Sequence, residues 1–274
     1  MNELSLVVLD QGRHHAVLQK PAGITVVRAR GVPGPTLLDL AEQRFGRGVR
    51  PVHRLDKPTT GCCVVALSAF GQQALSDAFR RHLIDKRYLA LITGAPTWEK
   101  LAIDVRLARE DLPEARKGPL ARQTVDENGK RALTRVRVLA RADGMALVEA
   151  RPETGRMHQI RIHLAHVGHP LEGDPIYGAG ERGDLFFLHA FALSFPLPDG
   201  GRSFASAPLP AAFDERLKRL GLDGSALWAA EVERFSKRKS EPGHAARTTP
   251  RRATGSAPSG GKPSTPRPRS KRRR

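Results

Sequence analysis

The sequence is poor in cysteine, in aromatic residues and in long apolar runs. Only two of its 274 residues are cysteines, and these two, Cys62 and Cys63, are adjacent. Neighbouring strand residues point to opposite faces of a sheet, so the two thiols are badly placed to bridge each other. There is also no C-x-x-C pair. We therefore expect no disulfide framework and a reducing, cytoplasmic location.

Apolar stretches are short throughout. None approaches the ~18 residues that a membrane span needs. The first ten residues lack the basic start and the long apolar centre of a signal peptide. We expect a protein that makes no use of a membrane.

Acidic residues are scarce beside basic ones, with 28 Asp and Glu against 46 Lys and Arg and a formal net charge of +18. Residues 237–274 hold 13 Lys and Arg and one Glu, which leaves a net charge of +6 for residues 1–236. Because Pro, Ser and Gly are interleaved with these charges, we predict a disordered basic tail at 236–274 behind a globular domain at 1–235. Such a charge favours a polyanionic partner, although a charged tail can also serve solubility alone.

Periodicity predicts interleaved strands and helices. Strands are expected at 4–9, 16–18, 86–93, 132–139 and 145–151, and helices at 36–46, 68–82, 160–168 and 211–220. Residues 108–131 are charged and rich in Pro and Gly, which indicates a long exposed loop or insertion. The irregular order of elements favours an α+β fold around a mostly antiparallel sheet.

The most informative segment is HRLDKPTTG, residues 53–61, in which one carboxylate, Asp56, stands between Arg54 and Lys57. It leads directly into an apolar, β-branched run, Cys62–Leu67, that is typical of a buried strand. A carboxylate held at the mouth of a sheet beside two cations is a candidate for chemistry. Taken alone, Asp56 is better interpreted as a residue that caps a turn before the strand.

A second segment, residues 154–178, is dense in Arg, His and Gly. Together with Lys20–Gly23, Lys86–Leu91 and Leu188–Ala190, the two segments resemble the RluA-type branch of the RNA pseudouridine synthases, in the family's order over roughly residues 10–213. The resemblance implies an isomerase that acts on tRNA or rRNA and needs no cofactor or metal. It also implies a bent, mostly antiparallel mixed sheet flanked by helices and loops around a basic cleft.

The same resemblance implies a role for each of four residues. Asp56 corresponds to the catalytic carboxylate, and Arg161 to the arginine that pairs with it. Arg54 corresponds to a contact to the RNA backbone, and Tyr88 to the ring that lies against the uracil. The alternatives are ordinary ones: a solvated Arg161 on a helix face, a surface ion pair for Arg54 and a core position for Tyr88.

Three histidines, His163, His166 and His169, are spaced three apart, with Glu172 and Asp174 close behind. Zinc-binding helices usually place two His at i and i+4, and that pairing is absent from this segment. We therefore expect no metal site. A metal-dependent hydrolase built on these residues is kept as a minor alternative, as is a non-catalytic RNA-binding or ribosome-assembly protein with the same fold.

The sequence departs from the family's pattern in three places. Only about 20 residues precede Lys20, so we expect the additional RNA-binding domain that many members carry to be missing. The segment after Gly23 lacks the His that commonly follows, and Thr60 stands where Ser is usual. Substrate choice is then expected to come from the catalytic domain, the 108–131 insertion or the tail. A monomer is the default expectation.

Overall fold

The computed structural model describes residues 5–29, 32–111, 121–181 and 183–240. The strands are β1 (Val7–Gln11), β2 (His15–Lys20), β3 (Arg50–Pro51), β4 (Thr60–Ala66), β5 (Asp85–Thr93), β6 (Lys100–Asp111), β7 (Ala121–Val125), β8 (Lys130–Ala142), β9 (Met145–Pro152), β10 (Leu188–Pro196) and β11 (Arg202–Ser206). The helices are α1 (Leu37–Phe45), α2 (Ala69–Arg80), α3 (Gln159–His166), α4 (Ala211–Arg219) and α5 (Gly224–Ser240). None of these helices is long and apolar enough to cross a membrane.

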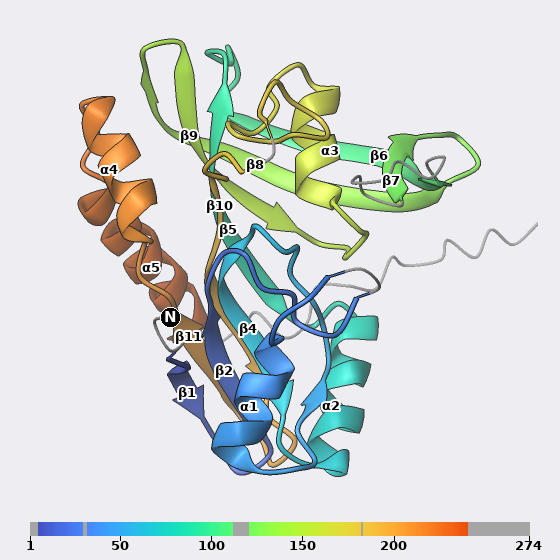
Figure 1. Cartoon of the computed structure of the whole chain (residues 1–274). Coiled ribbons are helices and arrows are strands. Elements are labelled where there is room, and N and C mark those ends of the chain that lie inside the picture. The colour runs from blue at the N-terminus through green and yellow to red at the C-terminus, as the bar shows by residue number, and fades with distance from the viewer. Residues whose placement is uncertain (1–4, 30–31, 112–120, 182, 241–274) are drawn as a thin grey trace, which may run out of the picture. The chain divides into compact units, whose positions relative to one another are not determined.

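Within the described residues the strands form one mixed sheet with the order β1-β2-β4-β10-β5-β9-β8-β6-β7, and β3 and β11 pair at its side (Figure 1). The pairing of β4 with β10 is parallel, whereas the other strand pairs are antiparallel. The predicted α+β class and mostly antiparallel mixed sheet are confirmed. The chain divides into Met1–Arg238 and Lys239–Arg274, and almost all of the second unit lies outside the described residues. The predicted 1–235 and 236–274 division stays a prediction.

The sheet is apolar on both faces, and neighbouring residues alternate between them. On β4, Cys63 packs in the core on the α1 and α3 face, whereas Cys62 packs on the α2 face. Both cysteines are buried and free, in agreement with the prediction that they do not bridge each other. Tyr88 on β5 belongs to the first face, while Leu89 packs on the opposite face under α4 and α5. Each such fully buried large side chain contributes about 1.5–3 kcal/mol.

Local sequence signals explain several of the helix and strand ends. The Thr36 side chain accepts from the N–H of Asp39, and Asp39 returns the bond to the backbone of Thr36, which forms a capping box before α1. Gly46 ends this helix with φ +85°, as its position in the sequence predicted. The β8–β9 hairpin turns at Asp143 and Gly144, both with positive φ, in agreement with the predicted turn.

The expectation of an exposed loop at 108–131 is wrong for most of its described residues. They form the end of β6, the strand β7 and the start of β8, which pair as an antiparallel arm, while residues 112–120 lie outside the described part. Helix α5 was not predicted, and it extends through residues 236–240, which we had assigned to the tail. The end of this helix is rich in Lys and Arg, as the tail is, so composition alone did not separate the helix from the tail.

The parallel contact between β4 and β10 fixes where the Asp56 segment enters the sheet. Gly61 pairs with Ala190 and has φ +108°. A Cβ at Gly61 would lie 2.2 Å from the carbonyl oxygen of Ala190. Only glycine allows the two backbones to approach this closely at that φ.

We expect Gly61→Ala to lower the free energy of unfolding by about 3 kcal/mol or more, because backbone strain adds to a backbone clash. The matched control is Gly144→Ala, where φ is also positive but no atom lies within 4 Å of the added Cβ. That control should cost only about 1 kcal/mol. Urea unfolding of both variants measures the difference, and equal losses would contradict the role given to the Ala190 contact.

Candidate active site

Asp56 lies in the loop between β3 and β4, and this loop is fixed by a buried lysine. The Lys20 Nζ donates to the carbonyl oxygens of Pro21 at 2.8 Å, Lys57 at 2.9 Å and Thr59 at 2.7 Å. Lys20 is fully buried, so its three donors are all used inside the protein. Burial lowers the pKa of Lys20 to about 8, and the nearby charge of Asp56 acts in the opposite direction.

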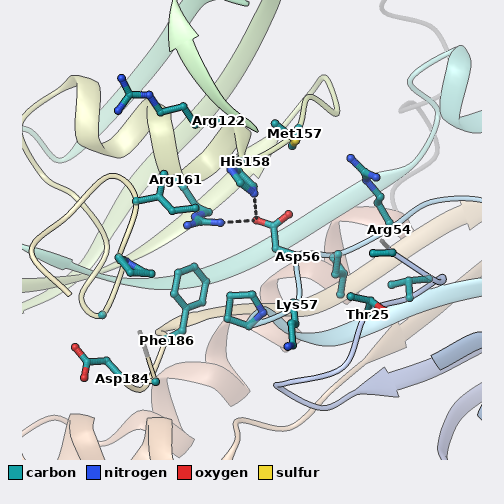
Figure 2. Close-up of a pocket in the computed structure, with 18 of the residues that line it drawn as sticks. Thr25, Arg54, Asp56, Lys57, Arg122, Met157, His158, Arg161, Asp184 and Phe186 are labelled. Carbon is teal, nitrogen blue, oxygen red and sulfur yellow. Dashed lines mark hydrogen bonds and ion pairs between the residues drawn. The ribbon is translucent and has the colours of Figure 1, made fainter. Parts of the chain in front are cut away.

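Arg161 on α3 places its guanidinium against Asp56, as the sequence analysis expected (Figure 2). The Arg161 Nη1 donates to Asp56 Oδ2 at 3.3 Å. The Arg161 side chain is only 3% exposed, whereas that of Asp56 is 23% exposed. Since a buried guanidinium needs compensation, the solvated-arginine alternative is excluded and a second partner is required.

That second partner is Asp174. The Arg161 Nε and Nη2 donate to the two Asp174 carboxylate oxygens at 2.8 and 2.7 Å. Asp174 Oδ1 also accepts from the backbone N–H groups of Ile176 and Tyr177. Burial raises the pKa of Asp174, but the Arg161 bonds and charge and the two N–H groups outweigh burial and hold the pKa below its usual value.

The guanidinium is further enclosed by two rings. The Arg161 Cζ lies 5.3 Å from the ring centroid of Tyr177 and 5.1 Å from that of Phe186. Burial lowers the pKa of Arg161, but the bonds and charges of Asp174 and Asp56 raise it by more. The net shift of the Arg161 pKa is therefore upward. Arg161 therefore holds a permanent positive charge between two carboxylates, with ring faces that favour a cation.

Two hollows, of about 730 and 650 Å³, meet at Asp56. They share Arg54, Leu55, Asp56, Met157, His158 and Arg161. We call the smaller one the Tyr88 hollow, because Tyr88 lines it, and the larger one the Phe186 hollow. Both contacts to the Asp56 carboxylate are made through Oδ2, so Oδ1 has no partner among the described residues.

The two hollows differ in charge. The Tyr88 hollow is lined by five Arg and Lys, namely Arg54, Arg80, Lys86, Arg156 and Arg161, and Asp56 is the acidic residue in its wall. The Phe186 hollow is also lined by five Arg and Lys, but it contains Glu181 and Asp184 as well as Asp56. A nucleotide with its phosphates is therefore attracted more strongly to the Tyr88 hollow.

The four residues predicted from the sequence all line the Tyr88 hollow. Tyr88 is 9% exposed and packs in the core, and burial, followed by the charge of Asp56, raises the pKa of its phenol. Arg54 is exposed at the entrance of both hollows and makes no hydrogen bond or ion pair with another described residue. The surface-pair alternative for Arg54 is thus without support in the structure.

Three residues of the site were missed. Asp174 had been considered only as a metal ligand, although a buried arginine signals a need for a carboxylate. Lys86, whose Nζ donates to the Thr154 carbonyl at 3.0 Å, lies beside Tyr88, and burial lowers its pKa to about 8. His158 lies with its Nε2 3.9 Å from Asp56 Oδ2.

The suspected metal ligands do not converge. The described residues contain no group of three or more His, Cys, Asp and Glu that could hold a metal ion. Asp174 binds Arg161 instead, and the His169 Nδ1 lies 3.1 Å from the carbonyl oxygen of Thr93.

Comparison with known proteins links this geometry to one enzyme class. A family model described as RNA pseudouridylate synthase matches residues 14–166. An uncharacterized RNA pseudouridine synthase of Zymomonas mobilis is 37% identical over 206 residues, which are 73% of this chain and 91% of that protein. The ribosomal large subunit pseudouridine synthase D of the same organism is 34% identical and matches over 73% of this chain and 68% of its own length.

Among solved structures, human RNA pseudouridylate synthase domain containing 1 superposes with a TM-score of 0.65 at 28% identity. The superposition covers 77% of this chain and 87% of the human protein. Human RNA pseudouridylate synthase domain containing 4 gives the same TM-score at 25% identity, over 78% of this chain and 92% of that one.

The buried pair gives a stability prediction. Asp174→Asn keeps the size of the side chain but leaves the Arg161 charge without its main partner, so the free energy of unfolding should fall by about 3–5 kcal/mol. Asp104→Asn is the matched control, because it breaks an equally short pair with Arg131 that is exposed to solvent. Chemical denaturation should show a large loss for the first variant and almost none for the control; similar losses would contradict the role of Asp174.

Proposed function

Since this chain belongs to the RNA pseudouridylate synthase family and is an isomerase that acts on RNA, we propose that Asp56 is the carboxylate that carries the isomerisation. The resemblance to the RluA-type branch is confirmed by the family match and by the relatives named ribosomal large subunit pseudouridine synthase D. The identity of the catalytic residue is the part that we propose here.

The reaction rearranges bonds without a net change in composition. The bond between the sugar C1′ and uracil N1 breaks, the uracil turns, and a bond forms between C1′ and C5. The proton on C5 leaves to solvent, and N1 gains a proton. The protein must supply a closed pocket for a flipped-out nucleotide and one ionised carboxylate that acts as nucleophile or base. We propose that no cofactor or metal takes part.

One observation carries the proposal for Asp56. Its Oδ2 is bound by the buried Arg161, which is itself anchored by Asp174. Its Oδ1 has no partner in the described part of the chain, and the side chain borders both hollows. A carboxylate with one fixed and one free oxygen beside a pocket is preorganised to attack or to accept a proton. Arg161 offsets the cost of keeping this charge in a partly buried place.

We propose that the target uridine enters the Tyr88 hollow. Tyr88 there offers a ring face to the uracil, as expected from its motif, and stacking tolerates rotation of the base within its plane. The basic side chains around the entrance suit the flanking phosphates, with Arg54 as the one closest in sequence to Asp56.

Structured tRNA and rRNA are the proposed substrates. Several relatives are named for the ribosomal large subunit, which makes large-subunit rRNA the first substrate to test. We further propose a monomer that acts in the cytoplasm, where its two free cysteines stay reduced.

Tritium release from RNA labelled at uracil C5 tests the role of Asp56. We expect the wild-type chain to release tritium from unmodified total tRNA or rRNA and Asp56→Ala to release none, because no other described carboxylate adjoins the Tyr88 hollow. Asp104→Ala, a charge loss far from both hollows, should act like wild type. Release by Asp56→Ala would refute the assignment. Retained RNA binding without any release by wild type would instead favour the RNA-binding protein.

Arg54 is expected to contact a phosphate. Arg54→Met should weaken binding to every RNA tested and should reduce the slope of log K against log salt by about 1, because one fewer counterion is released. Lys218→Met removes the same charge from α4, outside both hollows, and should leave the slope unchanged. Filter binding across a KCl series measures both slopes, and an unchanged slope for Arg54→Met would argue against a phosphate contact.

A further inference from the structure

His158 has a backbone conformation that its residue type rarely adopts. Its φ and ψ are 53° and 19°, in the left-handed region, and it precedes α3 without forming a side-chain cap. Such a conformation costs a non-glycine residue about 1–3 kcal/mol and persists only where its surroundings impose it. The backbone conformation of His158 is therefore imposed by neighbouring contacts rather than by local preference.

One of these contacts is a hydroxyl. The His158 Nδ1 lies 3.2 Å from Tyr177 Oη, and the two rings meet edge to face at 5.7 Å. The Tyr177 oxygen already accepts the backbone N–H of Gln123 at 2.7 Å. Its own proton can then be donated to His158 Nδ1, and in that tautomer the imidazole proton lies on Nε2. Burial is the largest influence on His158 and, despite the charge of Asp56, lowers its pKa, which keeps the ring neutral.

The Nε2 side of the same ring faces the proposed catalytic carboxylate. Nε2 lies 3.9 Å from Asp56 Oδ2, and Figure 2 shows the ring directed at this oxygen beside the Arg161 guanidinium. A protonated Nε2 presents a donor to a carboxylate whose position decides the reaction. The ring thus restricts Asp56 from one side, while Arg161 does so from the other.

The far end of this series of contacts is a strand of the arm. β7 is the last strand in the sheet order, so one of its edges is unpaired within the sheet. Asp126 donates its N–H to Arg106 of β6, which indicates that even-numbered N–H groups of this segment face β6 and odd-numbered ones face outward. Gln123 is odd-numbered, and its outward N–H is the group bound by Tyr177.

We propose that His158 is a positioning residue for Asp56, held by Tyr177, and that Tyr177 in turn ties it to the backbone of β7. This proposal rests on the proposed catalytic role of Asp56. The neighbouring β7 residue Arg122 lines the Phe186 hollow, so the segment that Tyr177 binds borders the site. The arm and the catalytic loop are thereby connected by two hydrogen bonds and the contact between His158 and Asp56.

Tyr177→Phe is the central variant, because it keeps the ring beside Arg161 and removes only the hydroxyl. Under single-turnover conditions with a labelled RNA that the wild type modifies, we expect the rate to fall about 10- to 100-fold while the RNA affinity stays within about twofold. His158→Asn, whose side chain tolerates the left-handed backbone, should give a similar loss. The double variant should be no slower than the slower single one, because both substitutions interrupt the same series of contacts.

The backbone link has its own matched pair of variants. Gln123→Pro removes the N–H that Tyr177 accepts, at an unpaired edge where proline is tolerated. Val125→Pro removes the next outward N–H, which has no such partner, and should keep the wild-type rate. The rate should fall about tenfold only for Gln123→Pro.

Several outcomes would overturn the proposal: a wild-type rate for Tyr177→Phe, losses that multiply in the double variant, or equal effects of the two prolines. A rise in the dissociation constant of Tyr177→Phe with an unchanged rate would also overturn it, since it would make Tyr177 a substrate contact. The proposed function fails separately. Tritium release by Asp56→Ala would refute the role of Asp56 itself, whatever the Tyr177 variants do.

Discussion

The site depends on one buried guanidinium. Arg161 cannot be sequestered with its charge unless a carboxylate accompanies it, and Asp174 meets this need by accepting two of its hydrogen bonds. The remaining nitrogen of the guanidinium, Nη1, donates to Asp56. The turn at residues 173–177, the rings of Tyr177 and Phe186 and the start of α3 all serve this arrangement. Gly173 allows it, since a Cβ there would lie 1.8 Å from the Leu185 carbonyl oxygen.

The loop that carries Asp56 is restrained in a similar way by a second buried cation. There a buried ammonium, Lys20, gathers three carbonyl oxygens, and Gly61 locks the end of the loop against β10. One cation therefore fixes the carboxylate directly, and another ties the backbone that follows it, at Lys57 and Thr59, to Pro21. Both rely on the same asymmetry: a buried charge adds little when it is satisfied but is costly to leave unsatisfied. Rigidity at Asp56 thus follows from burial rather than from the loop's own conformational preferences.

Sequence reasoning succeeded where the signal was local. The cap before α1 and the hairpin turn at Gly144 depend on residues within a few positions of one another. It failed at 108–131, because this end of the arm carries charged side chains on its exposed face and the polar Gln123 on its buried face, so the apolar alternation that marks a strand is lost. Asp174 was missed for a different reason: its partner lies 13 residues away, and only the fold shows that their side chains meet. The four residues assigned by resemblance lie together, although their roles rest on the proposal.

The charge state of the site is set by burial and pairing more than by the solution pH near neutrality. The pKa of Asp174 is held down and that of Arg161 up, so their charges persist, while the lowered pKa of His158 leaves its ring neutral. The two lysines are the groups whose burial brings the pKa to about 8. Below that pH, Lys20 keeps all three donors and binds the carbonyl oxygens of Pro21, Lys57 and Thr59. Above it, an uncharged amine has only two donors for three carbonyls, so deprotonation loosens the loop while the Arg161 anchor remains intact.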